Sequence, residues 1–347
     1  MSSNLASDRI TVGADPLDVF EALYAEGVTD GLPVIPPTPE RVAQFVAALG
    51  RDPQDLIGEV SPRNGLATVE KLAINAVMAG CRPDYMPVLV AIVEAICRPE
   101  FNLHGIQATT NPVAVMTIVN GPIRAELDVN CGRNCLGPGR RANATLGRAV
   151  RLVQLNVGGA IPAEVDKATH GMPGKYTLLF GEAEEESPWE PLHVERGLAA
   201  GESAVTVVGV QGTNNIFPAY HRADDVLKCL ANGLACFGNN NVYLGGGNPV
   251  VILNPGHARL LHEQGYSKLD VKRELFERSK MPLEIFPDAP IAIQTERERV
   301  IEDGKICVTQ RPEDLMVVVA GGPEAYHVQY CASFGDTWAV TVPVAKS

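Results

Sequence analysis

Short apolar runs bounded by turn residues constrain the fold of this chain more than any other feature. Residues 113–119 follow an Asn-Pro pair and stop at Asn-Gly-Pro, while residues 250–253 follow Asn-Pro and stop at Asn-Pro-Gly. Two similar runs, residues 204–210 and 315–320, also end in loops rich in Gly or Asn. Short runs rich in β-branched residues are typical of strands buried on both faces, as in parallel sheets.

Helical patterns alternate with these runs, as in residues 86–96 and 224–237. The order of helix, Gly-rich turn, Asn-Pro, strand and Pro/Gly stop is found twice in the chain. It predicts an α/β fold of two related halves with mixed or mainly parallel sheets. The internal repeat is weak, because the spacing between the two Asn residues differs between the copies.

The predicted fold divides the chain into four segments. Residues 1–60 form an N-terminal helical and extended segment, and residues 61–180 form the first α/β half. An acidic linker, residues 181–203, leads to the second α/β half, residues 204–347. Ligands of such folds bind at the carboxyl ends of the strands. We therefore expect the loops at Asn120, Gln211, Asn254 and Gly321 to form one rim.

Composition excludes several classes of protein. The net charge of −12 argues against binding nucleic acid over a broad surface, which needs basic stripes. No stretch of about 18 apolar residues predicts a membrane span, and the N-terminus has no signal-peptide pattern. The eight cysteines are scattered, as in a reducing compartment. These features predict a soluble, cytoplasmic protein, and we expect a homo-oligomer.

The stretch 130–157 combines two cysteines, a Gly-Pro-Gly turn and a helix that opens with arginines. Gly137 and Gly139 allow a close approach of backbone to ligand. Arg141, Thr145 and Arg148 share one helix face, and guanidinium groups near a helix N-terminus bind carboxylate or phosphate. This predicts a site for a small anion. The alternative is the solvated basic face of an ordinary amphipathic helix.

Cys131 and Cys135 have three residues between them, one more than the usual redox spacing. They can form a redox pair, bind a metal or simply pack in the core. No second pair of metal ligands is evident at the usual spacing. If the two thiols lie beside cationic groups, their pKa values are lowered and they become candidate catalytic residues.

His193 and Lys175 are the candidates for proton transfer. Acidic neighbours of His193 are expected to raise its pKa, and Lys175 lies in a Gly-rich loop of the kind that closes over ligands. A structural or surface role is the alternative for each. A further polar cluster precedes an apolar helix and is a candidate for binding substrate; it consists of Arg63, Asn64 and Lys71.

Six stretches together resemble a family of bacterial proteins associated with small UGSC-type (seleno)proteins, which carry a Sec/Cys-Gly-Ser-Cys motif. The stretches are TDGLPVIPPTPERV, PRNGLATVEKLAINAVMAGC, FNLHGIQATTNP, GPGRRANATLGRAVRL, DKATHGMPGKY and SPWEPLHVERG. The resemblance implies a cytosolic protein that works beside a thiol or selenol partner.

The central loop is similar to the family pattern at most of its positions. Cys131, Cys135 and Arg140 depart from that pattern, which favours the anion site over the dithiol. The matching positions are Asn130, Gly132, Asn134, Gly137, Pro138, Gly139, Arg141, Asn143, Thr145 and Arg148. The resemblance thereby adds Asn134 and Asn143 to the candidate binding residues.

These observations predict an enzyme that acts on a small carboxylate- or phosphate-bearing substrate. The reaction is expected to be of lyase or hydratase type, or a thiol-assisted reduction. The alternatives are a non-catalytic subunit that presents a ligand to a UGSC-type partner, and a metalloenzyme whose ligands come from distant segments. The chain has no nucleotide fingerprint, so the sequence leaves the cofactor unknown.

Overall fold

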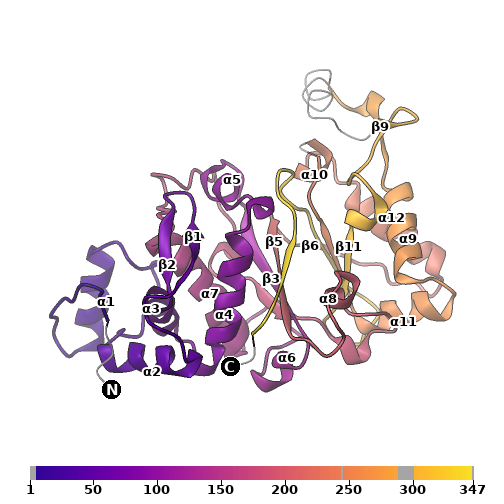
Figure 1. Ribbon diagram of the computed structural model, residues 1–347. Coiled ribbons are helices and arrows are strands. Elements are labelled where there is room, and N and C mark those ends of the chain that lie inside the picture. Colours follow the sequence, from indigo (N-terminus) through magenta and orange to yellow (C-terminus); the bar gives the residue numbers. More distant parts are fainter. Residues whose placement is uncertain (1–4, 244, 288–300, 346–347) are drawn as a thin grey trace.

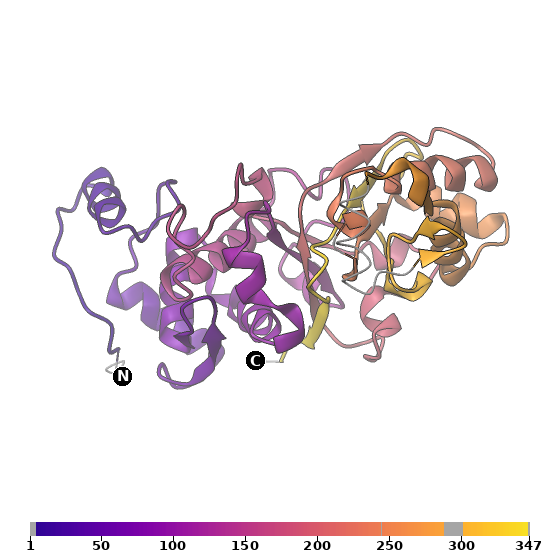
Figure 2. The same ribbon diagram turned by 90° about the horizontal axis from the view of Figure 1, so that it is seen from above.

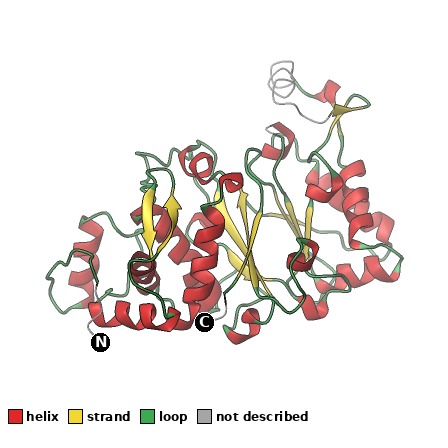
Figure 3. Cartoon of the chain, viewed as in Figure 1, coloured by secondary structure: helices red, strands yellow, loops and turns green. Residues whose placement is uncertain are grey.

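The computed structural model describes residues 5–243, 245–287 and 301–345. Within these residues the chain forms two four-stranded sheets that lie between two groups of helices (Figure 1). Helices and strands alternate along most of the chain (Figure 3). The predicted α/β class is therefore confirmed.

Each large sheet contains one parallel and two antiparallel pairings. In both sheets the parallel pair lies at one side and the antiparallel pairs follow. The first sheet runs in the spatial order β13 (Val340–Pro343), β5 (Ala204–Val210), β3 (Ala114–Asn120) and β4 (Leu179–Gly181). The second runs in the order β11 (Met316–Val319), β7 (Val250–Leu253), β12 (Val328–Cys331) and β6 (Asn214–Ile216).

The two sheets pack against each other, which explains why their strands are apolar at nearly every position. Met116 and Ile118 of β3 lie in one buried cluster with Val250 and Ile252 of β7. The alternate residues of β7 instead pack with the outer helices of the second sheet. Because successive side chains of a strand point to opposite faces, a strand in such a sandwich must be apolar on both.

Helices cover the outer face of each sheet. On the first sheet these are α4 (Met86–Ile96) and α7 (Arg141–Asn156), and α3 (Val69–Ala79) and α2 (Pro39–Leu49) pack in turn against those helices. Those of the second are α9 (Ala223–Leu234), α11 (Pro255–Glu263) and α12 (Lys268–Arg278). α12 begins with the capping box that its sequence predicts, formed by Ser267 and Asp270. α4 is buried on nearly all sides, which matches its uniformly apolar sequence.

Shorter elements connect these layers. The remaining α-helices are α1 (Pro16–Ala25), α5 (Leu103–Ala108), α6 (Ile123–Glu126), α8 (Leu192–Glu195) and α10 (Asn240–Tyr243). Single 3₁₀ turns are η1 (Pro83–Tyr85), η2 (Pro99–Phe101), η3 (Pro173–Lys175), η4 (Glu184–Glu186), η5 (Leu283–Ile285) and η6 (Pro312–Asp314). Small sheets are formed by β1 (Leu56–Val60) with β2 (Gly65–Thr68), and by β8 (Met281–Pro282), β10 (Lys305–Ile306) and β9 (Ile301–Glu302).

The predicted boundary at residue 204 does not separate the two sheets. β5 and β13 were both placed in the second half, yet β5 pairs with β3 and β13 pairs with β5 in the first sheet. The strand after β5, which is β6, lies in the second sheet. The chain thus crosses between the sheets twice through its edge strands. A local pattern does not reveal such an exchange, and the structure does not show an internal repeat of the sequence.

The N-terminal segment loops away from the body, and α1 lies apart from the other helices (Figure 2). A groove of about 1080 Å³ beneath this segment has a mostly apolar lining that includes Ile74 and Met78. Glu70, which also borders the groove, is held by the backbone N–H groups of Ala6 and Ser7. No helix among the described residues is long and apolar enough to cross a bilayer.

Asn143 fixes the central stretch to the first sheet. Its buried amide donates to the carbonyl oxygens of Asn130, Cys135 and Leu179 at 3.1–3.2 Å, and its Oδ1 accepts from the Asn130 N–H at 2.8 Å. The loop then reaches the second half, where the N–H of Gly321 donates to the Cys131 carbonyl at 2.8 Å. The central stretch therefore braces the two halves.

Replacing Asn143 with Ala is expected to lower the free energy of unfolding by about 3 kcal/mol, because it leaves buried backbone groups without partners. Urea denaturation measures the change. Asn232→Ala is the control, since Asn232 is exposed on α9 and bonds only within its own helix; we expect a change within about 0.5 kcal/mol. Equal effects of the two substitutions would contradict this role of Asn143.

Candidate functional site

Three of the four predicted rim loops, those at Asn120, Asn254 and Gly321, lie at the same edge of the molecule. The chain just after β4, which runs parallel to β3, shows this. Ala183, just after β4, donates its N–H to the Val319 carbonyl at 2.7 Å, and Gly321 bonds to the loop of Cys131. Gln211 lies at the opposite edge, because β5 runs antiparallel to β3. The rim prediction is therefore wrong for Gln211.

The shared edge is filled by the chain's own side chains. The guanidinium of Arg124 is buried and contacts Glu184 at 3.1 Å and Glu185 at 2.7 Å. Asn120, the last residue of β3, donates to Glu182 and Glu184 at 2.7 and 2.9 Å. Burial raises the pKa of Glu182. This acidic network closes the carboxyl ends of β3 and β4.

His193 is completely buried on α8, next to this network. Neither of its ring nitrogens has a hydrogen-bond partner among the described residues. The preceding N–H, that of Leu192, donates to Glu182 at 2.7 Å. His193 therefore lies near the carboxyl end of β4, whereas Lys175 lies before the amino end of that strand. The structure does not bring the two predicted proton-transfer residues together.

The two arginines predicted to hold an anion both bind the protein itself. Arg141 donates to the carbonyl oxygens of Gly80 and Cys81 at 2.9 and 3.1 Å. These two residues directly follow the end of α3. Arg148 forms a bidentate pair with the buried carboxylate of Asp30, with both distances 2.8 Å. These close acceptors give both guanidinium groups a role in holding the fold, although Arg141 itself remains exposed.

The other predicted binding residues of the central stretch have local partners. Thr145 donates to the Arg141 carbonyl at 2.8 Å. Asn134 has a positive φ and donates to the Pro138 carbonyl at 2.8 Å, so it stabilises the turn. Gly137 packs against the Asn134 side chain, and Gly139 has a φ of 128° that favours glycine. Together with Asn143, these residues shape the loop between the halves.

Arg63, Asn64 and Lys71 gather around the hairpin of β1 and β2, away from the central stretch. Arg63 forms an exposed pair with Glu164 at 3.1 Å. Asn64 accepts from the hydroxyl of Ser61 at 3.0 Å, and Lys71 donates to the Leu66 carbonyl at 2.8 Å. The structure therefore does not place this cluster beside the predicted anion site.

The prediction of lowered thiol pKa values is wrong for both cysteines of the central stretch. Burial raises the pKa of Cys131, although Nη1 of Arg124 lies 4.0 Å from its sulfur and acts in the opposite direction. Burial raises the pKa of Cys135 to about 11. Desolvation outweighs the nearby cation, because the loss of hydration destabilises the thiolate more than the attraction of one partly shared guanidinium stabilises it.

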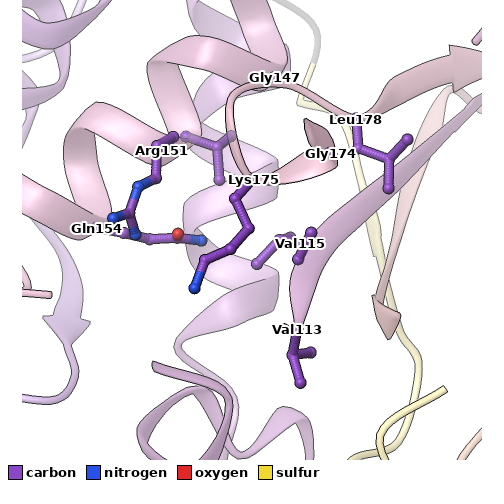
Figure 4. A pocket seen from close by; sticks show the side chains of 10 residues that line it. Val113, Val115, Gly147, Arg151, Gln154, Gly174, Lys175 and Leu178 are labelled. Carbon is purple, nitrogen blue, oxygen red and sulfur yellow. The ribbon is translucent and has the colours of Figure 1, made fainter. Parts of the chain in front are cut away.

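A small cavity lies instead at the amino ends of β3 and β4, against the C-terminal half of α7 (Figure 4). Its volume is about 10 Å³, roughly the space that one water molecule requires. Lys175 is the predicted site residue that lines it. The full lining consists of Val113, Ala114, Val115, Gly147, Val150, Arg151, Gln154, Gly174, Lys175 and Leu178.

A buried carboxylate positions the charged groups of this cavity. Lys175 Nζ contacts the two carboxylate oxygens of Asp166 at 2.8 and 2.6 Å, and Arg151 approaches the same carboxylate at 3.5 Å. All three side chains are at most 14% exposed. Burial lowers the pKa of Lys175 and Arg151 acts in the same direction, whereas the contact with Asp166 acts to raise it. Two cations share one carboxylate, so the cluster carries an excess positive charge.

Two polar groups that face the cavity are poorly satisfied. The contacts of Arg151 with Gln107, Ala160 and Asp166 are all 3.3–3.5 Å, longer than usual for N–H···O bonds. Gln154 is 4% exposed as a residue; its amide makes no hydrogen bond among the described residues and borders the cavity, so it is not one of the polar groups sealed from solvent. Figure 4 shows Arg151, Gln154 and Lys175 directed toward one another. Buried polar groups in this condition indicate that a ligand or water completes the site.

Arg151, Gln154 and Asp166 were not predicted from the sequence as site residues. Arg151 and Gln154 are three residues apart and share a helix face with Gly147, which was a detectable signal. Asp166 stands in the DKATHGMPGKY stretch, nine residues before its partner Lys175. Nothing local indicated that this loop packs against the end of α7.

No three His, Cys, Asp or Glu side chains gather closely enough to hold a metal ion among residues 5–243, 245–287 and 301–345. Comparisons with protein-family models, curated proteins and solved structures gave no significant match. The resemblance to the UGSC-associated family therefore stays an expectation. The fold and the site by themselves define an α/β protein with a buried cavity lined by a guanidinium, an ammonium and an amide group.

In the folded protein, iodoacetamide at pH 7 is expected to modify Cys236 much faster than Cys135. Cys236 is exposed, whereas a thiol with a pKa of about 11 is ionised in only about one molecule in ten thousand at this pH. Peptide mass spectrometry at timed intervals measures both rates. Modification of Cys135 as fast as that of Cys236 would contradict the raised pKa and restore the thiol hypothesis.

Proposed function

We propose that this protein is an enzyme that binds a small carboxylate-bearing substrate in the cavity at Arg151, Gln154 and Lys175. The observation that carries the proposal is the amide of Gln154, which lines the cavity and makes no hydrogen bond among the described residues, beside the loosely bound guanidinium of Arg151. A carboxylate accepts hydrogen bonds from both groups. It also balances the positive charge that Asp166 leaves uncompensated.

Lys175 and Asp166 supply the proton-transfer pair of the proposed enzyme. Their direct contact gives the proton a short path from the ammonium to the carboxylate. Burial and Arg151 lower the pKa of Lys175, while Asp166 acts in the opposite direction without reversing the shift. A base with a lowered pKa next to a bound carboxylate suits removal of a proton from the carbon beside it. Elimination and hydration proceed through such a step, so we propose a reaction of lyase or hydratase type.

The small volume of the cavity limits the substrate. Space for one water molecule accepts a carboxylate head group only if the rest of the substrate is short or the neighbouring loop moves. That loop, Gly171 to Gly174, contains two glycines and leads directly to Lys175. Substrates with long or branched chains are expected to be excluded by the valines and the leucine of the lining.

Propanoate at a hundredfold excess over its Kd is expected to stabilise the protein by about 2.7 kcal/mol. Arg151→Met should weaken this binding at least tenfold, since a charge-assisted hydrogen bond contributes about 1.5–3 kcal/mol. Thermal denaturation over a series of propanoate concentrations measures both effects as shifts within each variant. Because each shift is measured against the same variant without propanoate, any loss of stability caused by the substitution itself does not affect the comparison.

Arg140→Met is the matched control, because Arg140 lies at the start of the same helix and pairs only with exposed Asp128. It should keep the full propanoate response. Equal responses of the Arg151 and Arg140 variants, or none in the wild type, would contradict the proposed site. Saturable binding without turnover of any acid tested would favour the non-catalytic binding subunit.

A further inference from the structure

We infer that Lys175 forms an imine with the carbonyl carbon of a short 2-oxo acid whose carboxylate is bound by Arg151. This inference rests on the proposed function and narrows its substrate to acids that carry a carbonyl next to the carboxylate. The geometry behind it is a lysine amine, an acid–base partner and an anion-binding guanidinium on one small cavity.

Imine formation requires a lysine that is neutral and accessible from an apolar cavity. Lysines become nucleophilic when they are desolvated or lie beside a second cation. Lys175 meets both conditions, because it is 14% exposed and Arg151 shares its carboxylate partner. The walls around it are apolar and include Val113, Val115 and Leu178.

Asp166 is placed to move every proton that the reaction needs. It first accepts a proton from the Lys175 ammonium, with which it is in contact at 2.6 Å. The amine nitrogen then bonds to the carbonyl carbon, and the carbonyl oxygen takes the proton back through Asp166 to give a carbinolamine. Loss of a second proton from nitrogen and departure of water leave the protonated imine. The ammonium and the oxo acid thus yield an iminium and one water, with no further reactant.

Arg151 and Gln154 fix the orientation of the oxo acid. They lie three residues apart on α7, so both side chains reach the same side of the cavity. Arg151 pairs with the carboxylate, and the free amide of Gln154 donates to the adjacent carbonyl oxygen. This donation polarises the carbonyl and afterwards holds the carbinolamine hydroxyl. It also gives the buried Gln154 the partner that it lacks.

The experiment treats the full-length protein with pyruvate and sodium cyanoborohydride, which reduces an imine to a stable secondary amine. Peptide mass spectrometry then compares Lys175 with Lys167, an exposed lysine on the same loop that bonds only to the Ala163 carbonyl. We expect labelling of Lys175 to exceed that of Lys167 several-fold, because Arg151 holds the oxo acid beside Lys175 and burial lowers the pKa of this lysine.

Three comparisons make the result specific. Acetone, which has a carbonyl but no carboxylate, should not label Lys175 above Lys167. Phenylpyruvate should fail as well, because the small cavity has no room for its ring. Arg151→Met should lower pyruvate labelling of Lys175 at least tenfold while that of Lys167 is unchanged, and circular dichroism confirms that this variant is folded.

Absence of excess label on Lys175 with pyruvate overturns the imine. If propanoate still stabilises the wild-type protein but not the Arg151 variant, carboxylate binding stands and only the imine is rejected. If neither pyruvate labelling nor propanoate stabilisation is seen, both the imine and the proposed function are rejected. Label on Lys175 that is equal with acetone and pyruvate rejects the role of Arg151 and supports a reactive lysine alone.

Discussion

The buried carboxylate of Asp166 is the interaction on which the site depends. A lone charge in this position would be strongly disfavoured; the close pairing with Lys175 offsets most of the loss of hydration, and the Ala168 N–H donates to the same carboxylate at 3.2 Å. Arg151 adds a second cation at 3.5 Å, which the same carboxylate cannot fully neutralise. The remaining positive charge acts in surroundings of low polarity, where its attraction for an anion is stronger than in water. An anionic ligand is therefore the simplest means of completing the cluster.

The sequence predicted the α/β class because burial on both faces leaves a strand apolar at every position. It could not predict which strands pair in parallel, since the same apolar run serves either direction once it is sandwiched between layers. β3 shows this well: it runs parallel to β4 on one side and antiparallel to β5 on the other. The placement of β5 and β13 in the first sheet depends on where distant segments meet, and no local pattern records that.

The site was predicted only in part for the same reason. Arg141, Arg148 and Arg151 stand on one helix and have identical chemistry, so sequence alone could not rank them. Their environments differ: two carbonyl oxygens face Arg141, the carboxylate of Asp30 faces Arg148, and only distant acceptors face Arg151. A cation that already has close acceptors stabilises the fold, whereas one without them remains able to bind a ligand. Lys175 was identified because its loop is unusual in sequence.

The central stretch nevertheless contributes to the site, through the position of α7. Asn143 joins the start of the helix to the Leu179 carbonyl of β4, and its own carbonyl accepts from Thr177 at 3.0 Å. One turn later, a Cβ at Gly147 would lie 2.9 Å from the backbone nitrogen of Leu178, so only glycine allows this approach. Arg151 follows after one further turn on the same face. The residues that resemble a ligand-binding loop thus set the distance between helix and strand, and that distance keeps the cavity open beside Lys175.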